Sequence, residues 1–535
     1  MTRATDPAAR LLARSPSPWL AFVLVAALFI WHASRFAYVV DDAYISFRYA
    51  RHLATQGELA YNVGERVEGI TNLLWTLVLA ATWPLNENLE RTAQLGGVAL
   101  GVLVLFVLWR WGYQRGKLGR WMALGPPLVL AVSVPLPLWS QSGLETVLVT
   151  LLLLGAAVAA ESRTFTVGRG LACGLLGGFA FATRPDAGLL FVLAVVPRLL
   201  RVHVLGVHVF WRHDPAPSCP ARGPTKKKGA FLAALALFAT VVGGVTLFRW
   251  LYFGELVPNT FFAKRSFLNL MVHHGLDYVE AILWYFILPS ALVLVALGRH
   301  IPSGLLAVIR HPFVWVSVLF GLYLVPTGGD WMPYYRYFVP VAPWLLVGLW
   351  EAVATLRAKR RALFLATGLT CAALFLAGQG GVQRRWLEYN RDKLTPELEL
   401  IAATLGPLPE GASIALSVAG LIPYRTDRST VDLLGLNDRV TAHSDPVPMK
   451  SLPGHYKLNA EHVLSTLRPD YVLLDLGAAL SKEPRSDVKG WDLEKTLQAH
   501  PLFCQEYRLT ALRAPDGRFL NLYERSASVP ATRER

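Results

Sequence analysis

Residues 19–54 read WLAFVLVAALFIWHASRFAYVVDDAYISFRYARHLA, an apolar run that ends at two aspartates and continues as a polar stretch with helical spacing. The apolar run is long enough to cross about 30 Å of hydrocarbon as a helix. Comparable runs recur as far as Ala377, and 53% of the chain is hydrophobic against 17% charged, more apolar than a soluble core of this length needs. We therefore predict an all-α polytopic membrane bundle in residues 1–378. The ordinary mixed sequence of residues 379–535 predicts a separate soluble α/β domain, called the C-terminal domain below.

The basic residues indicate which loops face the cytoplasm. The net charge is +15, but lysines and arginines form short clusters between apolar runs instead of one basic face, which argues against a nucleic-acid partner. Cytoplasmic loops typically carry such clusters, so we place all of them inside. They are Arg3/Arg10/Arg14, Arg110/Arg115/Lys117/Arg120, Arg198/Arg201, Lys226/Lys227/Lys228 and Arg357/Lys359/Arg360/Arg361.

This placement depends on the segment Gly69–Leu85, which is apolar enough to be counted as a span. Counting it would move the later basic clusters to the outside. Laying it along the outer interface, which its Trp75 and Trp83 favour, keeps every cluster inside. We adopt the second option, which gives about eleven spans, a cytoplasmic N-terminus, a C-terminal domain outside, and interfacial helices in the first loop (residues 41–72). The predicted spans are 18–38, 92–109, 121–139, 146–160, 169–183, 187–200, 230–252, 279–297, 312–327, 337–356 and 362–378.

The first span is interpreted as an anchor in the cytoplasmic membrane. A basic start and the small residues Ala33–Ser34 also fit a secretory signal, but the apolar run is long for one. The four cysteines, Cys173, Cys219, Cys371 and Cys504, lack metal-ligand spacing, and only the last lies in the C-terminal domain. No disulfide is therefore available within that domain.

The C-terminal domain shows alternating helical and β-type segments. Helical periodicity is found at Glu397–Thr404 and Asn459–Leu467, and β-type runs at Ser413–Val418 and Tyr471–Leu476. Two further alternating runs flank Pro515-Asp516-Gly517, which predicts a hairpin. About 150 residues are enough for one independent core.

Asp41 and Asp42 stand directly at the lipid boundary, where a carboxylate is costly unless it faces water, a partner or a substrate. In the helix-compatible stretch that follows, Tyr44, Arg48 and Arg51 are three or four residues apart, so one face carries acid, phenol and guanidinium together. Plainer alternatives remain open. The acids would also suit the start of a helix, and arginines, Arg66 included, often anchor to lipid headgroups.

The later outer loops carry the same kinds of residue. Lys264 and Arg265 run against the positive-inside bias, which favours a functional role. Alternatives are a helix cap at Glu145, a span end at Arg184 and a turn at Asp330. Packed together, these loops would line a polar cavity open to lipid and water. The residues concerned are Glu145, Arg184, Asp186, Asn259, Lys264, Arg265, Asp330 and Arg336.

A cavity of this kind suits a sugar carried on a polyprenyl phosphate. Cations stabilise the phosphate charge that grows as the sugar departs, and a carboxylate accepts the proton of the attacking hydroxyl. Direct attack with one base implies inversion. We predict Asp41 and Asp42 as catalytic, and Glu145, Asn259 and Asp330 as further active-site residues. The donor phosphate would be bound by Tyr44, Arg48, Arg184, Lys264, Arg265 and Arg336.

The ordered motifs resemble the GT-C class of bacterial membrane glycosyltransferases, in particular the group typified by the mycobacterial terminal β-(1→2) arabinofuranosyltransferase. The resemblance extends from Trp19 to about residue 525. It is carried by DDAYISFRYARHLA with NVGERVEGITNLLW, SGLET, ATRPDAG, YFGELVPNTFFAK, GGDWMPYYRYFVP and AGLIPYRTDRSTVDLLGLND.

The resemblance implies a polytopic bundle, interfacial helices in the first loop, an exported C-terminal domain and no required metal or other cofactor. It places the catalytic acid on Asp41 or Asp42, of which Asp41 is preferred as nearer the membrane surface. The second acidic position of the class falls on Glu145, where Asp is usual. The group uses decaprenyl-phosphate arabinofuranose, but these motifs mark the lipid-phosphate chemistry more than the sugar.

The expected partners are therefore a polyprenyl-phosphate-linked sugar, a glycan, lipid-linked or protein acceptor, and membrane lipid, in envelope biogenesis. A polar patch in the C-terminal domain, with Tyr424, Asp432 and Asn437, is a candidate acceptor site; turn chemistry around Gly420 and Gly435 is the alternative. A flippase for lipid-linked saccharide would show paired broken helices with midplane charges in two related halves, a pattern absent from the sequence. A non-catalytic assembly protein is a third hypothesis.

Overall fold

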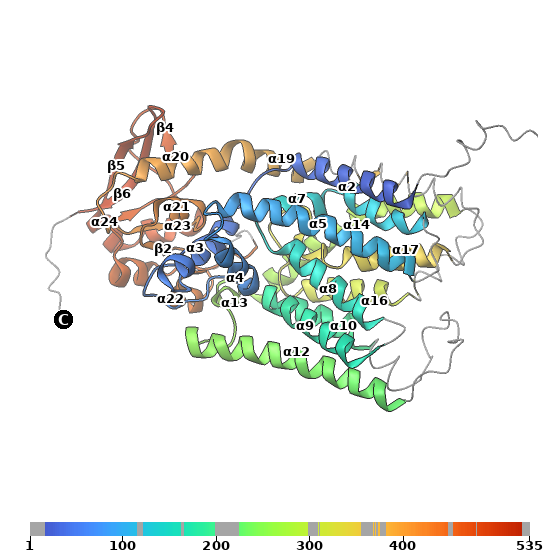
Figure 1. Ribbon diagram of the computed structural model, residues 1–535. Helices are drawn as coiled ribbons and strands as arrows, with labels where there is room; N and C mark the ends of the chain where they lie inside the picture. Colours follow the sequence, from blue (N-terminus) through green and yellow to red (C-terminus); the bar gives the residue numbers. More distant parts are fainter. Residues whose placement is uncertain are drawn as a thin grey trace, which may run out of the picture.

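A computed structural model describes residues 17–114, 121–161, 165–197, 224–297, 311–354, 381–447, 453–477 and 479–526, together with positions 309, 368, 370, 373 and 374. It forms a helical bundle that carries a small sheet domain at one end (Figure 1). The bundle helices are α2 (Pro18–Ser34), α5 (Leu89–Gln114), α6 (Gly125–Val132), α7 (Pro135–Gln141), α8 (Thr146–Ala160), α9 (Val167–Thr183), α10 (Pro185–Ala194), α12 (Pro224–Phe253), α14 (Leu268–Leu297), α16 (Pro312–Leu324) and α17 (Ala342–Ala354). Helices thus cover the predicted spans up to residue 354, and the last predicted span lies almost wholly outside the described residues.

Continuous helices long and apolar enough to cross a membrane are fewer than the spans predicted. Within the described ranges there are two, Leu89–Gln114 and Lys228–Phe253, or three if one bent pair counts as a span. Several others are apolar but only 10–17 residues long, such as α2 and α8. Since a helix rises about 1.5 Å per residue, these cover about 15–25 Å of the bilayer.

The predicted span 121–139 is broken. A short 3₁₀ turn (Met122–Leu124) and α6 are separated from α7 by a bend of 57°. Ser133 is extended, with ψ of 143°, and α7 begins at Pro135. Pro135 lacks the N–H that would continue the helical ladder, and the chain leaves the helical conformation at Ser133, so the apolar run bends here.

The first loop lies at the end of the bundle, next to the C-terminal domain (Figure 1). It begins with α3 (Asp41–Gln56), against which the ten-residue α4 (Leu73–Thr82) packs. About 15 Å of helix is half of what a span needs, in agreement with an interfacial place for Gly69–Leu85. A second short helix, α13 (Asn259–Ala263), packs nearby on the C-terminal domain.

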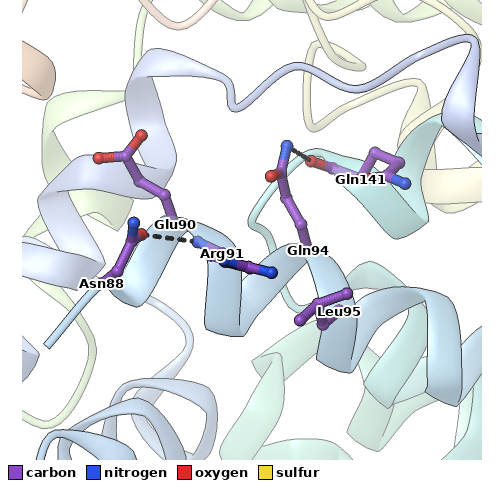
Figure 2. A pocket seen from close by; sticks show the side chains of 6 residues that line it. All are labelled: Asn88, Glu90, Arg91, Gln94, Leu95 and Gln141. Atoms are coloured by element: carbon purple, nitrogen blue, oxygen red, sulfur yellow. Dashed lines mark hydrogen bonds between the residues drawn. The ribbon is translucent and has the colours of Figure 1, made fainter. Parts of the chain in front are cut away.

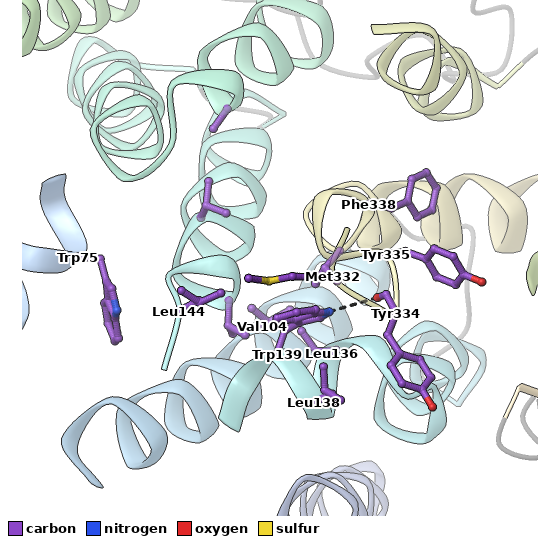
Figure 3. Close-up of a cluster of buried hydrophobic side chains, with 14 of the residues drawn as sticks. Trp75, Val104, Leu136, Leu138, Trp139, Leu144, Met332, Tyr334, Tyr335 and Phe338 are labelled. Atoms are coloured by element: carbon purple, nitrogen blue, oxygen red, sulfur yellow. Dashed lines mark hydrogen bonds between the residues drawn. The ribbon is translucent and has the colours of Figure 1, made fainter. Parts of the chain in front are cut away.

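Buried aromatic side chains fix the loop that carries Asp330 and Arg336. The indole of Trp139, on α7, donates to the Tyr334 carbonyl at 3.2 Å (Figure 3). Tyr334 and Tyr335 both have positive φ, 55° and 57°, a conformation that non-glycine residues adopt only when their surroundings enforce it. The core therefore determines where the charged residues of this loop point.

The C-terminal domain is entered through α19 (Gly381–Tyr389), a π-helical stretch (Asn390–Leu394) and α20 (Thr395–Leu405). Its sheet has the order β2-β1-β3-β6-β4, with β5 paired to β6. β1 (Ile414–Leu416) is parallel to β2 (Thr430–Asp432) and β3 (Tyr471–Val472). β5 (Tyr507–Arg513), β6 (Phe519–Arg525), β3 and β4 (Leu480–Ser481) join by antiparallel pairing. The remaining helices are α21 (Leu421–Thr426), α22 (Arg439–His443), a π-helix (His462–Leu467), α23 (Asp492–Gln498) and α24 (Pro501–Glu506).

These elements confirm the predicted α/β pattern, including the hairpin around Pro515-Asp516-Gly517, in which Leu512 pairs with Leu520. The loops that follow β1 and β2 lead into α21 and α22, which lie against the first loop and α13 (Figure 1). Carboxyl ends of parallel strands are where such sheets usually bind ligands. Here that edge docks on the bundle.

Candidate active site

Asp41 holds the C-terminal domain. Its carboxylate oxygens accept the backbone N–H groups of Gly420, at 3.1 Å, and Leu421, at 2.8 Å, at the start of α21. A side chain at Gly420 would collide with the Asp41 backbone, so only glycine permits this approach. Both carboxylate oxygens are therefore engaged by the C-terminal domain.

Asp42 has a different environment. Among the described residues it has no hydrogen-bond or ion-pair partner, although it lies one residue along the same helix. It is close enough to His455, of the C-terminal domain, to influence that ring, as are Lys264 and Asp330. Burial lowers the pKa of His455, the nearby Lys264 adds to this, and the Pro453 carbonyl and the two carboxylates oppose it. Like Asp42, the half-buried Lys264 has no hydrogen-bond or ion-pair partner among the described residues, and both charges act on the same imidazole.

Two predicted donor-binding arginines already have carboxylate partners. Arg184 contacts Asp186 through Nε at 3.0 Å and Nη2 at 2.7 Å, and Arg336 contacts Asp330 at 2.8 and 3.2 Å. Both guanidinium groups lie over the ring of Tyr337, at 4.4 and 5.2 Å from its centre. Two of the loops predicted to converge, those of Arg184 and Arg336, thus meet here in one buried charge network.

Glu145 belongs to this network. It lies 3.6 Å from Arg184 and accepts a hydrogen bond of 2.9 Å from the Asn72 side-chain amide. Its backbone caps α8, but its side chain makes no capping bond, so the simple cap alternative does not account for it. Arg265 is exposed beside the site, 5.6 Å from the ring of Phe261.

Arg48 does not face this network. Its Nε donates to the Tyr61 carbonyl at 2.6 Å, Nη1 to Pro423 at 2.5 Å, and Nη2 to Arg428 at 2.7 Å and the Asn62 side chain at 3.3 Å. The residue is only 2% exposed. Because every guanidinium nitrogen already has an acceptor, in the first loop for Nε and in the C-terminal domain for Nη1 and Nη2, we do not retain Arg48 as a phosphate ligand.

Tyr44 and Asn259 also act in docking. The Tyr44 hydroxyl donates to Glu90 at 3.0 Å, and its ring lies 5.5 Å from that of Tyr424. The Asn259 amide nitrogen donates to the carbonyls of Gly435, Leu436 and Asp438, in the loop after β2. Both side chains are only 2% exposed, so neither is accessible to the donor.

The predicted acceptor patch lies in the same interface. Tyr424, Asp432 and Asn437 are 6%, 1% and 4% exposed. Tyr424 packs on the first loop, where Phe47 lies 5.9 Å away, and Asn437 receives the Tyr49 hydroxyl at 3.3 Å while donating to Asp432. Burial against the first loop leaves them no surface for a glycan, so we assign them to docking instead.

Comparisons with known proteins agree with this architecture. Two crystal structures of ArnT from Cupriavidus metallidurans match nearly the whole chain at 12% identity. The apo form has a TM-score of 0.55, with 94% of this chain and 97% of that one covered, and the form bound to undecaprenyl phosphate has 0.54, with 96% and 99% covered. This chain has the fold of ArnT.

Sequence comparison adds a partial relative. The terminal beta-(1->2)-arabinofuranosyltransferase of Mycobacterium tuberculosis is 28% identical over 266 residues, which cover 47% of this chain and 38% of that protein's length. The match thus spans less than half of the relative. A family model described as a domain of unknown function (DUF8728) matches residues 388–523. The resemblance to membrane glycosyltransferases predicted from the sequence is confirmed by these likenesses.

Within the ArnT-like bundle, an open hollow of about 420 Å³ lies at the start of α5. It is lined by Asn88, Glu90, Arg91, Gln94, Leu95 and Gln141 (Figure 2). None of the predicted site residues lines it, and Glu90 is already bound to Tyr44 and Arg425. We therefore do not place the reaction there.

Sequence reasoning missed His455. It is a single histidine in the segment PGHYK, a pattern without motif value. Sequence reasoning also gave no role to Trp331, although the motif GGDWMPYYRYF contains it. Only the docked C-terminal domain brings His455 within range of the Asp42 charge and against Trp331.

A pH-dependent contribution to stability follows from Asp41. Burial raises its pKa to about 7, the Leu421 and Gly420 N–H groups oppose the rise, and Asp42 supports it. Because the folded pKa exceeds the unfolded value of about 3.9, this stability is fully present below that value and is lost as pH rises through 7. We expect the difference in unfolding midpoint between wild type and Asp41→Asn to shrink from pH 5 to pH 8, measured by thermal denaturation in detergent. A difference that grows with pH would contradict the raised pKa.

Proposed function

We propose that this protein is an inverting glycosyltransferase that moves a sugar from a polyprenyl-phosphate donor to an acceptor outside the cytoplasmic membrane. The observations that carry the proposal are that Asp42 and Lys264 have no hydrogen-bond or ion-pair partner among the described residues, and that both charges act on the ring of His455, whose neighbour Gly454 lies against the Lys264 side chain. The ArnT fold supports it, since ArnT itself has been crystallised with undecaprenyl phosphate. The likeness to an arabinofuranosyltransferase makes arabinofuranose the first sugar to test.

In the proposed step Asp42 is the base. The acceptor hydroxyl attacks the anomeric carbon as its proton passes to the Asp42 carboxylate, and the bond from that carbon to the phosphate oxygen breaks. The leaving phosphate keeps the bonding electrons and is weakly basic, so it needs no proton from the protein. Asp41, whose oxygens hold the C-terminal domain, positions its neighbour and α21.

Lys264 is the proposed ligand of the departing phosphate, with Arg265 beside it. The network around Tyr337 is less suited to bind an anion alone, because Glu145, Asp186 and Asp330 carry three negative charges against two on its arginines. We propose that Arg184 and Arg336 instead hold the loops that carry Asp186 and Asp330 in position beside the site. An anion bound at Lys264 would gain stabilisation as its charge grows in the transition state.

Replacing Lys264 by methionine is expected to reduce kcat/KM for the lipid donor about 10²-fold or more, the usual effect of removing one charge stabiliser. Transfer of radiolabelled sugar from synthetic polyprenyl-phosphate arabinofuranose by purified protein would measure this. Lys264→Arg keeps the charge and should retain more activity, whereas Lys482→Met, at an exposed position in the C-terminal domain, should have no effect. Full activity of Lys264→Met would exclude this lysine as the phosphate ligand.

The transfer assay also separates an enzyme from a flippase. An enzyme forms a new glycosidic bond in detergent, without a sealed membrane, whereas a flippase only moves the lipid across a vesicle wall. Mass spectrometry of envelope glycans and lipid-linked sugars from a deletion strain would identify the unused donor and the truncated acceptor. An unchanged glycan profile, together with no transfer in vitro, would refute the proposed function.

A further inference from the structure

Four partly exposed rings form a row beside the proposed site, here called the aromatic row. Trp386 is on α19, Trp331 follows in the loop after α16, and His455 and Trp491 belong to the C-terminal domain. Successive ring centres are 5.5, 5.5 and 6.4 Å apart, with interplanar angles of 67°, 81° and 74°. The row crosses from the bundle to the C-terminal domain outside the docking contacts of Arg48 and Asp41.

The row is adjacent to the reacting groups. Its third ring, His455, is the one influenced by the charges of Asp42, Asp330 and Lys264. Its second ring, Trp331, directly follows Asp330, whose carboxylate is held by Arg336. A ligand lying along the row would therefore lie against the ring that the charge of the proposed base influences.

His455 is held firmly. The hydroxyl of its neighbour Tyr456 lies 2.9 Å from Nδ1 of His274 on α14. On the other side, Gly454 lies against the Lys264 side chain, whose carbons would be 3.6–3.9 Å from a Cβ at this position. His455 Nδ1 lies 3.1 Å from the Pro453 carbonyl, which can only accept, so Nδ1 carries the hydrogen. In a neutral ring the opposite nitrogen, Nε2, is then an acceptor, and no described residue donates to it.

This combination fits carbohydrate. The faces of aromatic rings are electron-rich, and sugar rings present C–H groups of slight positive charge, so the two stack while burying apolar area. A few polar atoms among apolar rings then fix the orientation of a ligand, and a free imidazole nitrogen accepts a sugar hydroxyl. Edge-to-face contacts between tryptophans leave parts of their faces open for such stacking.

We propose that the aromatic row binds sugar residues of the acceptor glycan and directs its reactive hydroxyl to Asp42. The assignment of the glycan as acceptor rests on the proposed function; carbohydrate binding by the row does not. The row would replace the buried patch of Tyr424, Asp432 and Asn437 as the glycan site. Interfacial tryptophans also anchor proteins to lipid, but His455 with its free nitrogen has no use in such an anchor.

The test uses full-length protein in nanodiscs and an arabinofuranose oligosaccharide as probe, with binding measured by isothermal titration. Trp331→Ala and Trp491→Ala should each weaken binding about tenfold, the equivalent of one aromatic stacking contact. Trp491→Phe should restore most of the affinity. Trp250→Ala, at an exposed position on α12, is the matched control and should bind like wild type.

All three tryptophans pack against a hydrophobic core, Trp491 against that of the C-terminal domain and Trp331 and Trp386 against the larger one, so the thermal midpoint of each alanine variant is measured before its binding is interpreted. Trp386→Ala, on α19, should raise the acceptor KM in the transfer assay while leaving the donor KM unchanged. If the folded variants Trp331→Ala and Trp386→Ala bound the probe with unchanged affinity, the proposal that the aromatic row binds glycan would be wrong. The same conclusion would follow if the wild type bound no oligosaccharide. Weakened attachment to lipid, with intact glycan binding, would identify the row as an anchor and overturn the proposal too.

The outcomes separate the two proposals. Probe binding by wild type without any transfer would refute the glycosyltransferase and leave the row as a carbohydrate site. If the tryptophan variants transferred sugar with an unchanged acceptor KM, glycan binding by the aromatic row would be refuted, and the proposed glycosyltransferase activity would stand.

Discussion

Asp42→Asn is expected to lower sugar transfer at least about 10³-fold while donor and acceptor still bind. Removing a general base typically costs 10²–10⁴-fold, and an amide of the same shape cannot accept the proton of the attacking hydroxyl. Since Asp42 has no partner among the described residues, the substitution breaks no visible contact, and the protein should fold and dock normally. The measurement is kcat in the purified transfer assay, with donor binding followed separately.

Asp41→Asn is the informative comparison. An amide can accept only one of the two N–H groups of Gly420 and Leu421, and its own NH₂ faces the other, so the loss should appear first in stability and docking. The exposed Asp487→Asn serves as a neutral control. If Asp42→Asn transferred sugar normally and Asp41→Asn bound substrates but lost turnover, the base would be Asp41, as first preferred from the sequence.

Much of the fold could be predicted because lipid and strand pairing leave few choices. The helix α8 has the predicted bounds, 146–160, because the charged residues Glu145 and Glu161 limit an uninterrupted apolar run that is favourable within the bilayer. The hairpin likewise followed from its turn residues. The break before Pro135 was missed because apolar composition was given more weight than the helix-breaking effect of that residue.

The site could be predicted only in part. The acid pair, Lys264 and the loops with Arg184 and Arg336 could be proposed from the sequence because charged groups beside lipid are rare and conspicuous. Arg48 was predicted to be available for the donor phosphate because its partners are mostly backbone carbonyls, and any residue type can supply a carbonyl, so the sequence does not reveal them. One of these, Pro423, lies 375 positions away in the sequence. His455 could not be found for the same reason: its neighbours are supplied by docking.

Arg48→Ala is expected to have the largest effect on stability, about 3–5 kcal/mol, as is usual when a buried charged group is removed from its network. The carbonyl of Tyr61 would lose its donor, those of Pro423 and Arg428 would keep only their bonds from the Asp427 N–H and the Thr430 hydroxyl, and the ring of Tyr61 would lose the guanidinium 4.7 Å from its centre. Because two of these carbonyls belong to the C-terminal domain, the damage should concentrate at the interface. The thermal midpoint in detergent and hydrogen exchange of residues 414–434 would measure it.

Arg385→Ala is the matched control, since this arginine of α19 is exposed and has no partner among the described residues, and surface changes of this kind usually cost within about 0.5 kcal/mol. If docking brings His455 to the acid pair, Arg48→Ala should also reduce transfer although it touches neither substrate nor Asp42. Added Asp42→Asn would then cause little further loss, because an undocked domain and a missing base disable the same step. Normal hydrogen exchange with reduced transfer would mean instead that Arg48 contacts the donor, and the docking role assigned to it would be wrong.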